Sequence, residues 1–214
     1  MKYILLFFAV LLLPGCSHEI LRYHGREYKV IQAGDRYWMG ENLATSSYRN
    51  GKKIPLVNDT EKWPELYSPA HGFYKGDSSR LEKYGMLYNW YAVEAGKLCP
   101  LGWRVATHED WTKLEESMGG QLLAGGRIKS VKGWSGQHVS GDDRGFTALP
   151  AGYRLNDDFL EGKAAVWWTS TKAANDWVWG RRLDSNNNEL MNTFNNPANG
   201  FSVRCVSVRK ARNR

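Results

Sequence analysis

The sequence predicts an α+β domain with short antiparallel strands, one or two helices and long loops. Short runs of alternating apolar and polar residues, 27–32 and 36–39, flank a turn at Ala33-Gly34-Asp35. Only the stretch 108–118 carries a full set of helix signals. The 214 residues include 22 Gly, 10 Trp, 11 Tyr and 7 Phe. This composition favours loops around an aromatic core over a helix bundle or a doubly wound sheet.

The chain begins with the pattern of an export signal. Lys2 precedes an apolar run over 3–13, which is shorter than the roughly 20 residues needed to cross a bilayer and fits a signal peptide. The following Leu13-Pro14-Gly15-Cys16 resembles the lipobox of bacterial lipoproteins. That resemblance implies cleavage before Cys16, a diacylglycerol on its sulfur and a fatty acid such as palmitate on its amine. The alternative is an ordinary cleaved signal peptide with a coincidental cysteine.

We therefore expect a signal peptide over 1–15, a lipidated tether over 16–26, a folded domain over 27–208 and a basic tail over 209–214. Membrane lipid, reached through the acylated Cys16, is the expected partner. The expected location is the cell envelope, at the outer membrane, with the periplasmic or surface face left open.

The middle of the chain combines a long loop with the clearest helix. Residues 45–83 are polar and interrupted by Gly and Pro, which indicates an irregular excursion. An extended aromatic segment from Tyr84 is expected to become a short helix near Tyr91. In the helix over 108–118, Thr107 is the expected N-cap and Asp110 completes an approximate capping box. Its expected buried face carries Trp111, Leu114 and Met118.

The last third is expected to hold short strands joined by turns. Residues 122–130 look like short pieces with turns between them, and 146–154 looks like a kinked strand. The runs 165–171, 177–183 and 201–208 are the clearest strands. Between the last two lies a segment rich in asparagine, a residue that favours turns. Its asparagines are Asn186, Asn187, Asn188, Asn192, Asn195, Asn196 and Asn199.

The net charge of +7 is concentrated at the C-terminus. The basic residues of the tail are Arg209, Lys210, Arg212 and Arg214. Lysine and arginine elsewhere are scattered without a basic stripe, which argues against a nucleic-acid partner. The tail is either a solvated end or a contact for anionic lipid or lipopolysaccharide head groups.

The chain has 3 cysteines. If Cys16 is lipidated, Cys99 and Cys205 remain as an even pair in an oxidising compartment, which predicts a disulfide between them. Closing so long a loop would stabilise the fold by up to roughly 4–5 kcal/mol on the entropic model. The alternative is two free thiols.

Seven segments, in this order, resemble the motifs of the Fibrobacter succinogenes major paralogous domain family. They are 32–43 (QAGDRYWMGENL), 84–90 (YGMLYNW), 99–105 (CPLGWRV), Trp111, 145–154 (GFTALPAGYR), 167–171 (WWTST) and 200–206 (GFSVRCV). The resemblance implies a C-type-lectin-like fold related to the formylglycine-generating enzyme, with short twisted antiparallel sheets. It also implies a secreted or lipid-anchored protein. It does not imply a ligand, because a fold alone does not determine function.

The sequence offers no clear catalytic or metal-binding pattern. A formylglycine-generating activity needs paired active-site cysteines, and Cys99 and Cys205 occupy the family's structural positions. Neither a nucleophile elbow, a phosphate-binding loop nor a zinc spacing occurs, and the 5 histidines do not cluster. The calcium motifs of lectins are missing, and we interpret the acidic pairs at 142–143 and 156–158 as solvated turns. We therefore predict no enzyme, no cofactor and no metal.

The tryptophan-rich and asparagine-rich C-terminal third suggests a binding surface, because aromatic rings stack on ligands and amides both donate and accept hydrogen bonds. The predicted ligand-binding residues are Trp177, Trp179, Arg181, Asn187, Asn192 and Asn195. The predicted function is non-enzymatic binding of a glycan or a protein. One alternative is a variable protein of a diversity-generating retroelement, with its C-terminal region mutated at adenines. The other is an enzyme derived from the formylglycine-generating-enzyme-like fold.

Overall fold

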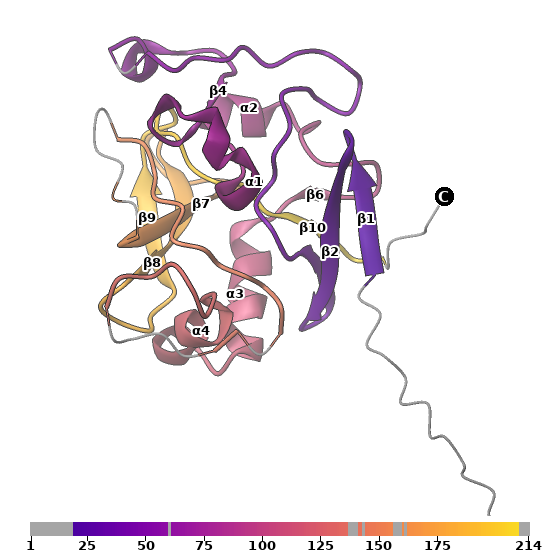
Figure 1. Cartoon of the computed structure of the whole chain (residues 1–214), viewed down its shortest axis with the longest axis vertical. Helices are drawn as coiled ribbons and strands as arrows, with labels where there is room; N and C mark the ends of the chain where they lie inside the picture. Colours follow the sequence, from indigo (N-terminus) through magenta and orange to yellow (C-terminus); the bar gives the residue numbers. More distant parts are fainter. Residues whose placement is uncertain are drawn as a thin grey trace, which may run out of the picture.

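The computed structural model describes residues 19–59, 61–136, 141–142, 144–155, 160 and 162–209. The predicted signal peptide, Cys16, and residues 156–158 lie outside this part of the chain. A five-stranded sheet has the order β1-β2-β3-β10-β6, and a second sheet contains β7, β8 and β9 (Figure 1). The first is built from β1 (Glu19–Tyr23), β2 (Arg26–Ala33), β3 (Arg36–Met39), β6 (Arg104–Val105) and β10 (Cys205–Ser207).

The second sheet consists of β7 (Ala164–Lys172), β8 (Val178–Asp184) and β9 (Met191–Asn195), and β4 (His71–Gly72) pairs with β5 (Leu87–Tyr88). The helices are α1 (Leu81–Tyr84), α2 (Trp90–Glu94), α3 (His108–Ser117) and α4 (Gln121–Ile128), with 3₁₀ turns at Trp63–Glu65, Tyr74–Gly76 and Ser78–Arg80. In Figure 1, α3 lies between the two larger sheets, and α2 lies at the top. Among the described residues, no helix is long and apolar enough to span a membrane. The predicted α+β class with short sheets is confirmed.

Several local predictions are confirmed. The hairpin of β2 and β3 pairs Val30 with Met39 across the expected turn. Helix α3 begins at its N-cap Thr107, whose hydroxyl accepts a hydrogen bond from the Asp110 amide, while the Asp110 carboxylate accepts one from the Thr107 amide. This reciprocal capping box was predicted because both signals lie within one helical turn. Residues 45–83 are mainly irregular, as expected.

Three predictions about the elements were wrong. Residues 19–23 are not tether but strand β1, joined to β2 by a two-residue turn in which His24 and Gly25 both have positive φ. Residues 121–128 form helix α4 despite Gly125-Gly126. A Cβ at Gly125 would lie 2.6 Å from the Asn188 carbonyl oxygen, so the glycine allows the helix to approach that loop. The asparagine-rich segment contains β9, which pairs with β8.

Strand β7 separates two aromatic clusters. Consecutive side chains of a strand point to opposite faces, and the fully buried Trp167 and Trp168 accordingly belong to different clusters. The Trp167 ring centre lies 5.6 Å from that of Trp111, and the Trp168 ring centre lies 4.3 Å from that of Phe201. The core therefore has two compartments with β7 as their common wall.

The Cys99–Cys205 disulfide is confirmed, with the two Cα atoms 5.9 Å apart and a sequence separation of 106. It ties the segment before β6 to β10. Next to it, the buried Arg204 donates hydrogen bonds to the main-chain oxygens of Met39 (2.9 Å), Phe146 (2.7 Å) and Thr147 (3.1 Å) and to Oδ1 of Asn42 (2.7 Å). One side chain thus joins three segments that are far apart in the sequence.

Candidate ligand-binding groove

A groove of about 460 Å³ lies beside the β7–β8 hairpin. Its wall carries aromatic rings from three segments, with Tyr67 82% exposed, Trp177 48% exposed and Tyr91 half-buried. The remaining lining residues are Trp90, Glu94, Lys172, Asn175, Asp176, Val178, Asn196 and Pro197. A volume between roughly 300 and 1,000 Å³ is typical of small-ligand sites. Trp177 is the one predicted ligand-binding residue in this groove.

The turn between β7 and β8 holds Trp177 in place. Asn175 and Asp176 have positive φ, +54° and +62°, a conformation that Asn and Asp tolerate better than other residues with a side chain. The Trp177 amide donates a 3.2 Å hydrogen bond to the Ala174 oxygen, and the Ala173 amide donates one of 2.7 Å to the Trp177 oxygen. This two-residue hairpin turn fixes the main chain on both sides of the exposed indole.

Asn89, the N-cap of α2, holds together the two segments that carry Tyr67 and Tyr91. Its Oδ1 accepts hydrogen bonds from the amides of Ala92 (3.2 Å) and Ala70 (3.0 Å), and its Nδ2 donates one to the Ser68 oxygen (2.8 Å). The loop that carries Tyr67 is thereby held against the helix that carries Tyr91. The two tyrosine rings lie 6.3 Å apart at 57°.

Charged and amide groups border these rings. Nζ of Lys172 lies 2.6 Å from Oε1 of Glu94 and 5.1 Å from the centre of the Trp90 ring. The hydrogen bond that Lys172 donates to Glu94 raises the pKa of Lys172. Burial, together with Tyr67 and Glu94, raises the pKa of Tyr91. The groove therefore offers stacking faces together with hydrogen-bond donors and acceptors.

The other predicted binding residues do not line this groove. Trp179 stacks between His108 and Phe194, with ring centres 4.2 and 4.1 Å away. Arg181 is fully buried and pairs with Glu115 at 2.6 Å, so its assignment to a ligand surface was wrong. The sequence suggested an exposed arginine two residues after Trp179, but β8 directs Arg181 towards Glu115 and Thr112 of α3.

The predicted asparagines are spread over the 186–195 segment. Oδ1 of Asn187 accepts from the Glu189 amide, and its main-chain oxygen accepts from the buried ammonium of Lys129. Asn195 donates to Oγ1 of Thr193 (2.9 Å). Asn192 is exposed on β9. Asn187 and Asn195 thus stabilise their own segment, and the asparagines do not converge on one site.

Of the groove's lining residues, sequence reasoning named only Trp177; those it missed include Tyr67, Tyr91, Glu94, Lys172 and Asp176. Tyr67 and Tyr91 lie in a loop and a short helix without a regular pattern, and Asn89 brings them together through hydrogen bonds that periodicity does not reveal. The available signal was the Asn175-Asp176 pair before Trp177, which is typical of a tight hairpin turn.

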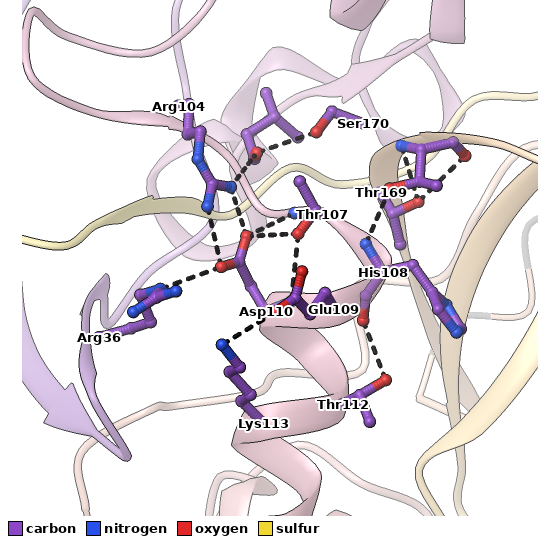
Figure 2. Close-up of polar contacts among 12 residues, drawn as sticks. Arg36, Arg104, Thr107, His108, Glu109, Asp110, Thr112, Lys113, Thr169 and Ser170 are labelled. Atoms are coloured by element: carbon purple, nitrogen blue, oxygen red, sulfur yellow. Dashed lines mark hydrogen bonds and ion pairs between the residues drawn. The ribbon is translucent and has the colours of Figure 1, made fainter.

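A second polar cluster surrounds Asp110 at the start of α3 (Figure 2). The carboxylate is 1% exposed and accepts hydrogen bonds from the side chains of Arg36 and Arg104 and from the amide and hydroxyl of Thr107. Burial opposes its ionisation, but the bonds from Arg104 and Thr107 outweigh burial and lower the pKa of Asp110 to about 2. Both carboxylate oxygens of Asp110 have hydrogen-bond partners within the protein. We therefore interpret this cluster as one that stabilises the fold.

The first prediction concerns this cluster. The Asp110→Asn variant should lose about 2 kcal/mol of unfolding free energy near neutral pH, because the carboxylate has a folded pKa of about 2 and an ordinary value of 3.8. Because the pKa of Asp110 is lower in the folded protein than in the unfolded chain, its carboxylate stabilises the fold at pH values above 3.8. This stabilisation disappears as the pH falls through about 2. Urea unfolding at several pH values should therefore show wild type and variant converging towards pH 2. Glu116→Gln, at an exposed site of the same helix, is the matched control. A constant difference between wild type and Asp110→Asn would contradict the assignment.

The acidic turn at 142 also has internal partners. Asp142 accepts hydrogen bonds from the amides of Phe146 (2.9 Å) and Thr147 (2.6 Å). Among the described residues, no group of three or more His, Cys, Asp or Glu side chains could hold a metal ion.

Comparison with known proteins gives one match. The family model described as Fibrobacter succinogenes major domain matches residues 31–207. No curated protein and no solved structure matches the chain.

Proposed function

We propose that this chain, which belongs to the Fibrobacter succinogenes major domain family, is a non-enzymatic lipoprotein of the cell envelope that binds a glycan. The observation that carries the proposal is the groove in which Tyr67, Tyr91 and Trp177 present aromatic rings. Exposed aromatic side chains that share a concave, partly polar site are typical of binding surfaces.

The polar lining favours a glycan over a protein ligand. The faces of a sugar ring expose apolar C–H groups that stack on aromatic rings, and its hydroxyls need both donors and acceptors at short range. Carboxylates of Glu94 and Asp176 and the amide oxygens of Asn175 and Asn196 can accept these bonds, and Lys172 and the amide nitrogens can donate. The groove has room for a few sugar rings.

The lipoprotein assignment rests on the segment 1–16 and is supported by the place where the domain begins. Strand β1 starts at Glu19, three residues after Cys16. An acylated Cys16 would hold the domain close to the bilayer because three residues span at most about 10 Å. The confirmed disulfide fits the oxidising compartment that export implies.

The second prediction tests the groove. Affinity electrophoresis in gels that contain laminarin, mannan, xylan or pectic galactan should show retardation by at least one of them. Trp177→Ala should weaken that binding by at least about tenfold, because a tryptophan that stacks on the ligand contributes more than about 1.4 kcal/mol. Tyr91→Ala should weaken it in the same direction.

The matched control is Phe194→Ala. Phe194 is 57% exposed on β9, in the same sheet, but does not line the groove. Equal binding losses in the Phe194 and Trp177 variants would contradict the proposal that the groove is the binding site. Failure of every polysaccharide to retard the protein would contradict the proposal that the ligand is a glycan. Release of shorter sugars that stops in Glu94→Gln would contradict a non-enzymatic role.

A further inference from the structure

We propose that a pocket beside the β1–β2 turn binds a sugar-sized molecule through a phosphate or sulfate ester. We call it the hairpin pocket. It has a volume of about 540 Å³ and lies between that turn, the loop 44–53 and the start of helix α1. It shares no lining residue with the groove, so binding here is independent of the ligand proposed for the groove.

His24 is held in an unusual conformation in the wall of the hairpin pocket. Its φ of +48° lies in the left-handed region, which is uncommon for a residue with a side chain. The imidazole stacks on Tyr23, with ring centres 4.1 Å apart, and its Nδ1 lies 2.6 Å from Oγ1 of Thr45. These two contacts fix the ring although the main chain is strained, an arrangement that is frequent at ligand sites.

The contact with Thr45 decides which nitrogen of His24 can meet a ligand. The Thr45 hydroxyl donates its proton to the main-chain oxygen of Ser47 (2.9 Å), so its oxygen accepts a hydrogen bond from Nδ1–H of His24. Nε2 makes no hydrogen bond to the described part of the chain. Because both nitrogens of a protonated imidazole donate, a protonated His24 can bond Thr45 with Nδ1 and an anionic oxygen with Nε2.

The charge around the hairpin pocket is positive. Arg49, Lys52 and Lys53 are exposed in the turn 49–53, and none of them forms an ion pair within the described part of the chain. Arg26 also lines the pocket and pairs with Glu82 at 2.7 Å. The Glu82 side chain is 83% exposed, so solvent screens its charge. The excess of cations attracts an anion to this pocket.

The hydrogen-bond donors reach the hairpin pocket from separate segments. His24 and Arg26 belong to the β1–β2 hairpin, and Ser46 and Lys53 belong to the following loop. The Ser46 hydroxyl has no hydrogen-bond partner in the described part of the chain. Donors that converge from several directions suit a tetrahedral phosphate or sulfate group, whose oxygens point in different directions, better than a carboxylate, whose two oxygens lie in one plane.

The size and the apolar side of the hairpin pocket indicate more than a bare ion. A volume of about 540 Å³ falls in the range of small-molecule sites. Leu81 of α1 and Met86 line the pocket together with the polar groups. The carbon skeleton of an ester can pack on these apolar side chains while its anionic group meets the donors.

Calorimetric titration with four matched sugars tests the hairpin pocket. Glucose 6-phosphate, glucose 6-sulfate, glucuronate and glucose share one ring and differ in the group at its sixth carbon. At about 0.15 M salt, at least one ester should bind, and glucuronate and glucose should bind at least about tenfold less tightly than that ester. Binding of one ester alone would identify its anionic group as the one recognised. Failure of both esters, or equal binding of glucuronate, would overturn the proposal.

Two neighbouring lysines provide a matched pair of variants. Lys53→Gln should weaken ester binding by at least about fivefold, because Lys53 lines the hairpin pocket. Lys52→Gln removes the same charge from the same turn but from a residue outside the lining, and should weaken binding by less than about twofold. Equal losses would assign the affinity to the general charge of the turn and overturn the pocket. Trp177→Ala should bind the esters like wild type, which distinguishes failure of this pocket from failure of the groove.

The pH dependence of binding tests His24. Burial and the charge of Lys53 lower the pKa of His24, so the imidazole of the free protein is neutral near pH 7. A bound anion favours the protonated form. The affinity for glucose 6-sulfate, whose own charge stays constant, should therefore rise at least about threefold from about pH 8 to about pH 5.5.

His24→Asn is the variant that isolates this effect, because asparagine tolerates the positive φ. It leaves the other charged groups of the pocket unchanged, namely Arg26, Lys53 and the Glu82 that pairs with Arg26. The variant should bind glucose 6-sulfate with the same affinity at both pH values. A rise in affinity that persists in His24→Asn would contradict a contact between His24 and the ester.

Discussion

Replacing Arg204 by methionine is expected to lower the free energy of unfolding by about 4 kcal/mol. The guanidinium is fully buried and supplies four hydrogen bonds to Met39, Asn42, Phe146 and Thr147. Methionine fills much of the volume but removes the donor from the main-chain oxygens of Met39, Phe146 and Thr147, whereas Oδ1 of Asn42 keeps its hydrogen bond from Trp167. Each unsatisfied buried group costs about 1–3 kcal/mol. Part of the loss is offset, because burial of the cation itself is unfavourable and lowers the pKa of Arg204 to about 9.

Urea unfolding followed by tryptophan fluorescence measures this loss, and Arg204→Lys is the informative companion. Lysine keeps the charge but cannot reproduce the planar fork of donors, so it should recover only part of the stability. Arg209→Met replaces an exposed arginine nearby and should change the free energy by less than about 0.5 kcal/mol. Full recovery by lysine would show that charge, and not the four directed bonds, holds this site together.

Removing the disulfide by Cys99→Ala with Cys205→Ala should also cost about 4 kcal/mol, or roughly 10 °C in melting temperature. The physical reason is the sequence separation of 106, because opening so large a loop increases the conformational freedom of the unfolded chain. Both cysteines are buried, so the smaller alanines add a packing loss.

The redox state supplies the control for this prediction. Wild type treated with a reductant under unfolding conditions should move towards the stability of the double variant, whereas the variant itself should not respond. A Cys16→Ser substitution should leave the melting temperature of the domain unchanged, because Cys16 is not part of the pair. A non-reducing peptide map that finds both thiols free would contradict the disulfide directly.

The parts of the fold that the sequence predicted depend on signals close together in the chain. The capping box of α3 lies between Thr107 and Asp110, and the β2–β3 hairpin depends on alternation around one turn. The disulfide was predicted because two cysteines remain after Cys16 is set aside and because an exported domain folds in an oxidising compartment. Helix α4 was missed because Gly125 indicates a break, and only its close contact with the Asn188 loop explains the glycine.

The candidate site was predicted less well, for a related reason. Trp177 and Trp179 are two residues apart and were expected on one surface, but the hairpin turn separates their environments. Tyr67 and Tyr91 meet through hydrogen bonds of Asn89, which no local pattern encodes. Arg181 shows the opposite error, since a charged residue in a strand was interpreted as exposed although Glu115 on a distant helix neutralises it.

The position of β10 has a consequence for how the chain is made. This strand lies between β3 and β6, yet it is formed by residues 205–207, close to the end of the sequence. During synthesis or export from the N-terminus, β3 and β6 therefore each keep an unpaired edge until residues 205–207 have emerged. Such edges are open to pairing with other chains. The nascent protein is thus vulnerable to aggregation until β10 has emerged, and a partner that protects exposed strand edges would matter most before then.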